Sequence, residues 1–212
     1  AFAEAMRAIA LAWLNEYEEL QSSTSALEAY CTEHQLVFWT AWARFMRGWS
    51  MVHLSAADKG IVLMREGMAQ WLATGAALHI PTQEAMIMEA CLTAGRNGEA
   101  AQAGENALRA CGLNGENLFL SEILRLQGVS AHRAGDADGA MIHFQSAIDE
   151  AAKNGAGLFE LRAMMSLVDV LQERNQHKQA AEGLARCLAK VDRDSNAAFI
   201  VAARKIYAAM ND

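Results

Sequence analysis

The stretch "LRLQGVSAHRAGDADGAMIHFQSA", residues 124–147, decides the fold. Its apolar residues recur at helical spacing on both sides of Gly135 and Asp136. Glycine readily adopts the left-handed conformation that ends a helix, and aspartate can cap the free amides of the next one. The stretch also carries small residues at fixed offsets with an aromatic residue between the last two: Gly128, Ala140, Phe144 and Ala147. It therefore predicts two helices that cross closely, because a larger side chain at the crossing would push the two backbones apart.

These positions belong to a repeat of 40 residues. One column of small residues contains Gly60, Ala100, Ala140 and Ala180, and a second contains Gly67, Ala107, Ala147 and Cys187. A column of large apolar residues contains Met68, Leu108, Ile148 and Leu188. Residues that end helices recur in the same phase, at Ser55, Gly95, Gly135 and Asn175. Self-similarity at such a period is typical of stacked helical hairpins.

The repeat predicts five hairpins followed by one capping helix. We expect repeat units near 1–35, 36–76, 77–115, 116–155 and 156–192, and a cap near 194–210. The expected helices are 2–13, 17–34, 37–54, 57–74, 81–94, 97–111, 117–134, 137–154, 158–174, 177–191 and 195–210. The last helix would cover the apolar face of the fifth hairpin, as terminal units of repeat proteins do.

The offsets of the small residues resemble the tetratricopeptide repeat pattern. Residues 124–147 match it best, although the period of 40 exceeds the usual 34 and lies in the range of HEAT repeats. The resemblance implies an all-α, right-handed α-solenoid, which we expect to form one repeat domain over residues 1–212. The composition agrees with an all-helical chain, since the 212 residues include a single proline and no β-branched runs at period two.

Charge and hydrophobicity exclude several classes of function. The net charge is −7, whereas nucleic-acid binding requires a basic surface. The longest apolar runs, such as "AIALAWL" (8–14), are too short to span a bilayer. We therefore expect neither nucleic acid nor a membrane as its partner, and we expect a cytoplasmic setting because the four dispersed cysteines suggest reduced thiols.

The sequence contains no arrangement typical of a catalytic, cofactor or metal site. The four cysteines (Cys31, Cys91, Cys111 and Cys187) lie far apart and are expected to be reduced, structural thiols. The six histidines form no HExxH pair, and no phosphate-binding glycine loop is present. His132 and Asp136 are four residues apart and could share an ion, but a hydrogen bond at a helix end explains them as well. "GDADGA" (135–140) lacks the length and the bidentate acid of a calcium loop, so we expect a turn.

A longer segment, residues 33–81, resembles a particular group of proteins. Its elements "FW" (38–39), "AWARFMRGW" (41–49), "GIVLMREGM" (60–68) and "ATGA" (73–76) are similar to the C-terminal repeat region of large bacterial signalling proteins that carry a predicted ATPase module. "AGRNGEA" (94–100) and "FELRAMMSLVDVL" (159–171) continue the likeness, whereas "CLAKVDRDSNAAF" (187–199) lacks the aromatic- and glycine-rich loop of that family. In such proteins a class III adenylate or guanylate cyclase domain or a DNA-binding domain often comes first. The resemblance implies a regulatory or scaffolding module cut from a longer protein, and it supplies no catalytic residue.

Solenoid geometry places a partner-binding groove along the first helices of the hairpins. The groove positions predict these contact residues, aromatic in the second unit and mostly charged in the later units: Trp42, Phe45, Trp49, His53, Arg125, His132, Arg133 and Arg162. Aromatic and arginine side chains often dominate binding energy at interfaces. Packing in the core is the alternative for the tryptophans, and spacing alone does not decide whether Trp42 and Trp49 face the groove or the core.

The sequence thus predicts a non-enzymatic module that binds a protein or peptide segment, which could belong to its own parent protein. A domain that senses a peptide or small ligand and gates an attached ATPase or cyclase is the alternative. An enzyme would need a nucleophile–base pair or a metal cluster, and the sequence shows neither. Whether the chain forms a homo-oligomer stays open.

Overall fold

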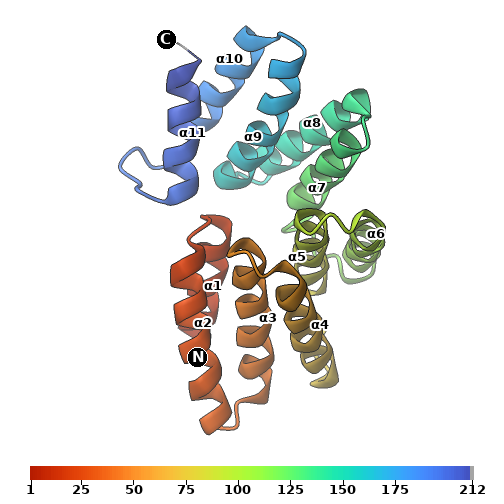
Figure 1. Ribbon diagram of the computed structural model, residues 1–212, viewed down its shortest axis with the longest axis vertical. Helices are drawn as coiled ribbons and strands as arrows, with labels where there is room; N and C mark the ends of the chain where they lie inside the picture. The colour runs from red at the N-terminus through yellow and green to blue at the C-terminus, as the bar shows by residue number, and fades with distance from the viewer. Residues whose placement is uncertain (211–212) are drawn as a thin grey trace. The chain divides into compact units, whose positions relative to one another are not determined.

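The computed structural model describes residues 1–210, except for the side chain of Asn114. In this part of the chain all regular structure is helical: α1 (Phe2–Trp13), α2 (Tyr17–Glu33), α3 (Val37–His53), α4 (Ala57–Ala73), α5 (Ile80–Thr93), α6 (Asn97–Asn114), α7 (Leu120–Arg133), α8 (Ala137–Lys153), α9 (Gly157–Glu173), α10 (His177–Leu188) and α11 (Ala198–Ala209). Figure 1 shows the helices described; most are joined by turns of three residues, whereas a longer loop, residues 189–197, connects α10 to α11. The predicted all-α class is confirmed. The first and last residues of each helix differ from the predicted ones by at most three positions.

The turns recur with strict regularity. Left-handed backbone conformations occur every twenty residues, at Asn15, Gln35, Ser55, Gly75, Gly95, Gly115, Gly135, Gly155 and Asn175. At most of these turns the next residue donates its amide to the carbonyl five residues earlier, as from Leu36 to Cys31 (2.8 Å) and from Asp136 to Ala131 (3.0 Å). This bond belongs to the Schellman motif, which satisfies carbonyl groups left free at a helix end. Each half of the 40-residue repeat therefore consists of one helix and one such turn.

The predicted turn at "GDADGA" (135–140) is confirmed in detail. Gly135 is left-handed, with φ of +85°. Asp136 then accepts a hydrogen bond from the amide of Gly139 at 2.8 Å and so caps α8. Pro81 likewise lies in the first turn of α5, where its missing amide hydrogen costs no helical bond.

The chain divides into two compact units, residues 1–110 and 111–212. The sequence-based expectation of one continuous domain over 1–212 stays a prediction, and it includes Asn211 and Asp212, which lie outside the described residues. In the first unit α1 packs on α2, and α3 packs on α4. Both α1 and α5 also contact α3, so the first helices of successive hairpins are neighbours. The core of this unit is built from the largest fully buried side chains of α3 and α4: Trp42, Phe45, Met46, Trp49, Ile61, Met64 and Trp71.

The second unit repeats this arrangement. Its hairpins are α7 with α8 and α9 with α10; α7 and α8 both contact α9, and α11 packs on α10. In both units an ion pair links successive hairpins from the same acidic column of the repeat, although the two arginines lie in columns two residues apart. Asp58 pairs with Arg96 in the first unit, and Asp138 pairs with Arg174 at 2.6 Å in the second.

Small residues make a close helix crossing between α3 and α4. A Cβ atom on Gly48 would lie 2.7 Å from the carbonyl oxygen of Gly60, and one on Gly60 would lie 2.6 Å from the carbonyl oxygen of Gly48. A third glycine, Gly67, would bring its Cβ to 2.7 Å from the backbone nitrogen of Phe45. Backbone lies against backbone here, so no side-chain rotation can make room for a methyl group.

In several hairpins a glycine of one helix faces a larger residue of the other. A Cβ on Gly128 would meet the ring of Phe144 at 2.5 Å, as expected from the sequence. In the α5–α6 hairpin the large and the small residue are exchanged. Met88 stands forty residues before Gly128, and Gly104 stands forty residues before Phe144. A Cβ on Gly104 would lie 3.0 Å from the sulfur of Met88. Met88 is therefore compensated across the hairpin, because Gly104 leaves room for its side chain.

Replacing Gly48 by alanine is expected to lower the free energy of unfolding by about 1–3 kcal/mol, because α3 and α4 must separate to admit the new methyl group. Urea denaturation followed by circular dichroism measures this loss. Gly98→Ala is the matched control, since a Cβ there meets nothing within 4 Å. It should cost nothing and can add up to about 1 kcal/mol through helix propensity. Equal stability of both variants would contradict the close crossing.

Candidate functional site

The predicted aromatic contact residues of α3 lie in the core. Trp42, Phe45 and Trp49 are 1%, 0% and 0% exposed. Helix α1 covers this face: the indole nitrogen of Trp42 donates to the carbonyl of Ala5 at 3.3 Å, and Trp13 packs on Trp49 with ring centroids 6.3 Å apart. Of the two alternatives left open by the sequence, the structure shows packing in the core, and it corrects the placement of these three residues on an open groove, because α1 occupies the space in front of them.

His53, at the end of the same helix, is half-buried. Its ring stacks on Tyr17 with centroids 4.2 Å apart and planes 3° from parallel, and it meets Trp49 edge-on. The imidazole of His53 therefore packs against two aromatic side chains of its own unit.

Two of the predicted arginines are also buried, around a shared carboxylate. Glu122, with a side chain 1% exposed, accepts hydrogen bonds from the Nε atoms of Arg125 (3.0 Å) and Arg162 (3.1 Å). Arg125 and Arg162 are 7% and 6% exposed as residues, so the expectation that they face a partner is corrected as well. Glu122 and Arg162 are 40 residues apart in one repeat column, and this spacing is the signal that could have predicted their pairing.

His132 and Arg133, at the end of α7, remain accessible. The side chain of His132 is 28% exposed, and its Nε2 atom lies 2.8 Å from the carboxylate of Glu173 on α9. The alternative pairing with Asp136 does not occur, since that carboxylate caps α8. Arg133 and Asp169 of α9 are exposed. The pKa of Asp169 is raised overall, because partial desolvation of its carboxylate outweighs the opposing effect of the charge of His132.

A cavity between α4, α5 and α6 was not anticipated from the sequence. It measures about 360 Å³ and lies entirely within the first unit. Arg65, Met68, Ala69 and Leu72 of α4, Glu84 and Ile87 of α5, and Glu99, Gln102, Ala103 and Asn106 of α6 line it. Ala69 and Ala103 are too small to fill the space between the helices. Three helices from two hairpins create this cavity, so no local pattern reports it.

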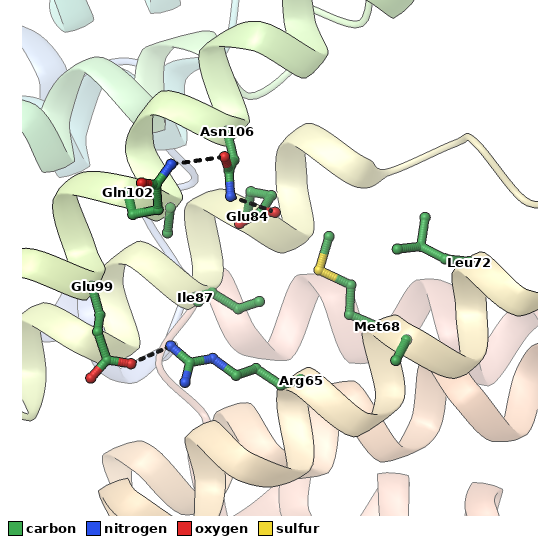
Figure 2. Close-up of a pocket in the computed structure, with 10 residues that line it drawn as sticks. Arg65, Met68, Leu72, Glu84, Ile87, Glu99, Gln102 and Asn106 are labelled. Carbon is green, nitrogen blue, oxygen red and sulfur yellow. Dashed lines mark hydrogen bonds and ion pairs between the residues drawn. The ribbon is translucent and has the colours of Figure 1, made fainter.

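The polar side chains of the cavity form two groups on either side of Ile87 (Figure 2). In the first, Arg65 pairs with Glu99. In the second, Gln102 donates to the Asn106 side-chain oxygen at 3.2 Å, and Asn106 donates to a carboxylate oxygen of Glu84, also at 3.2 Å. Met68, Leu72 and Ile87 supply the apolar part of the wall.

The two carboxylates of the cavity have opposite pKa shifts. Burial raises the pKa of Glu84, and the Asn106 hydrogen bond and the charge of Arg65 offset this only in part. The hydrogen bond from Arg65 lowers the pKa of Glu99. The cavity thus contains one carboxylate that is fully paired and another whose charge is poorly compensated.

No metal-binding cluster of three or more histidine, cysteine or acidic residues occurs in the described part of the chain. Cys31, Cys91, Cys111 and Cys187 are buried free thiols. Burial raises the pKa of each of them, and the nearby Glu160 helps to raise that of Cys187 to about 12. Nucleophilic chemistry requires the thiolate, which such environments suppress.

The structure defines an all-α protein in which consecutive helices pack as hairpins, with a lined cavity in its first unit. Across residues 1–210, none of the helices combines the length and hydrophobicity needed to cross a bilayer. No protein-family model matches the sequence, and neither does any curated protein.

Proposed function

We propose that this protein is a non-catalytic interaction module, a solenoid of tetratricopeptide-like hairpins with a period of 40 residues. The observation that carries the proposal is the row of contacts between first helices one repeat apart. In the second unit α7 and α9 are linked by Glu122 with Arg162, by Arg125 with Ser166 (3.5 Å) and by His132 with Glu173. Hairpins that stack in this register present a continuous face suited to an extended peptide.

The partner surface that we propose is the accessible end of this α7–α9 face. It combines His132 and Arg133 with Asp169 and Glu173, so it offers charges of both signs. Val129 and Met165 are partly exposed beside them. Such a mixture favours a peptide that carries charged residues around a small apolar contact.

A regulatory role in a larger signalling protein is the context that we propose for this module. The resemblance of residues 33–81 to the repeat region of ATPase-containing signalling proteins supports it. Any catalysis would then belong to other domains of such a protein, and the module would bind a segment of them or of a separate partner in the cytoplasm.

Selection of a random peptide library on the purified protein tests the proposal. We expect enriched peptides to lose affinity about tenfold or more when His132 and Arg133 are both replaced by alanine, because paired charges at an interface couple by more than 1 kcal/mol. The thermal melt should change little. Lys178→Ala is the control, since its side chain is 90% exposed on α10. Failure to enrich any peptide would contradict the function, and enriched peptides insensitive to the double substitution would contradict the surface.

The cavity favours a second candidate function, the sensing of a peptide or small ligand that gates an attached ATPase or cyclase. Its volume of about 360 Å³ lies at the lower end of the range of ligand sites, and it combines an apolar wall with a few polar groups. A ligand that binds only the folded state raises the melting temperature, so a thermal-shift screen of metabolites tests this candidate.

A further inference from the structure

We propose that the α4–α5–α6 cavity binds an alkylammonium group, with the nitrogen against Glu84 and the hydrocarbon chain on Met68, Leu72 and Ile87. This inference rests on the second candidate function, ligand sensing, and names the chemical class of the ligand. The group could belong to a free amine or to a lysine side chain of a peptide.

The first argument is the state of Glu84. Its hydrogen-bond partner is the neutral amide of Asn106. Among the described residues no ion pair within 4.0 Å involves this carboxylate, and the more distant charge of Arg65 lowers its pKa only in part. Asn106 is itself oriented by Gln102, so the two amides hold the carboxylate in place without neutralising it. A half-buried carboxylate with a neutral partner is stabilised by any cation that reaches it.

The second argument is the sign of the charge. The lining residues with formal charge are Arg65, Glu84 and Glu99, which sum to −1. The one cation of this set is already engaged, because Arg65 pairs with Glu99. An anionic ligand would meet two carboxylates and a guanidinium that is already paired, whereas a cation would complete the missing pair at Glu84.

The third argument is the shape of the apolar wall. Met68 and Ile87 are 9% and 5% exposed and form the floor, and Leu72 is 46% exposed at the rim. A linear alkyl chain can lie across these side chains, and methionine adapts readily to an unbranched ligand. The site would therefore distinguish an alkylammonium ion from ammonium alone.

Titration of the full chain with hexylammonium tests the inference at pH 7. Binding is followed by calorimetry and by the NMR shifts of the Asn106 and Gln102 side-chain amides. We expect hexylammonium to bind about tenfold more tightly than hexanol or hexanoate, the factor that one charge-assisted hydrogen bond supplies. A second arm compares a lysine-containing peptide with its acetyl-lysine form. Tighter binding of the unmodified peptide than of hexylammonium would identify a peptide as the source of the amine.

The decisive variant is Glu84→Gln. It should weaken hexylammonium binding about tenfold or more. It should not lower the melting temperature. The pKa of Glu84 is raised in the folded protein, so at pH values above the pKa of the unfolded state its ionised form destabilises the fold, and the neutral glutamine removes this cost. Glu105→Gln is the matched control; it removes the same charge from an exposed position of α6 outside the cavity.

Three results would overturn the inference: no binding of hexylammonium or of the lysine peptide, equal binding of hexanoate, or unchanged binding to the Glu84→Gln protein. Ligand sensing itself would survive such a result if an acidic or neutral metabolite raised the melting temperature. The two failures are therefore distinguishable.

Discussion

Replacing Trp49 by alanine is expected to lower the free energy of unfolding by about 3–5 kcal/mol, the range for removal of a large buried aromatic side chain. Trp49 is fully buried between Trp13 of α1 and His53 of its own helix, so truncation leaves a cavity between two hairpins. Urea denaturation monitored at 222 nm measures the loss.

Ile142→Ala serves as the control for Trp49. Its side chain on α8 is 67% exposed, and truncation there should change stability by about 0.5 kcal/mol or less. A Trp49→Ala protein with an unchanged melt and weakened peptide binding would place this residue at the partner surface after all.

Replacing Glu122 by glutamine is expected to lower the free energy of unfolding by a similar amount, about 3–5 kcal/mol. The change is nearly isosteric, so it removes charge and hardly any volume. Arg125 and Arg162 would then lie in the same buried site without the carboxylate that both of them now bind. The large cost arises because two buried guanidinium groups lose the negative charge of the carboxylate that they share.

A combined variant separates this explanation from simple loss of packing. Replacing Glu122 by leucine together with Arg125→Met and Arg162→Leu should recover much of the stability, because buried ionic clusters can often be exchanged for apolar side chains at little cost. Glu182→Gln is the surface control. Its carboxylate is 59% exposed and 3.9 Å from Lys178, so we expect a loss of about 0.5 kcal/mol or less. If Glu122→Gln were as mild as this control, the cluster would contribute little.

The helices and their boundaries were predictable because their signals are local. A left-handed residue every twenty positions ends one helix, and the apolar period identifies the next, so boundaries agree even where Gln35 or Ser55 replaces glycine. Two glycines of the α3–α4 crossing, Gly60 and Gly67, stand in small-residue columns of the repeat, whereas Gly48 was not singled out from the sequence. The exchange of Met88 and Gly104 was not recognised as compensation, since it requires knowing that these two positions face each other.

The accessibility of the candidate site residues was beyond the sequence. Trp42, Trp49, Arg125 and Arg162 occupy the columns expected of a groove, but the neighbouring helices lie close enough to bury them. The cavity beside Glu84 could not be predicted either. Its walls come from three helices, and its size depends on how far apart these helices pack.

The sequence by itself determined the helical hairpins of this protein, their forty-residue repeat and the columns of small residues at the hairpin crossings. Each of these depends on residues near in the chain or on columns repeated along it. Tertiary structure alone decided which repeat columns are covered, which carboxylate binds two arginines and which one, Glu84, has a neutral amide as its hydrogen-bond partner. Burial and charge pairing depend on the distance between packed helices, and that distance follows from all the side chains at an interface together.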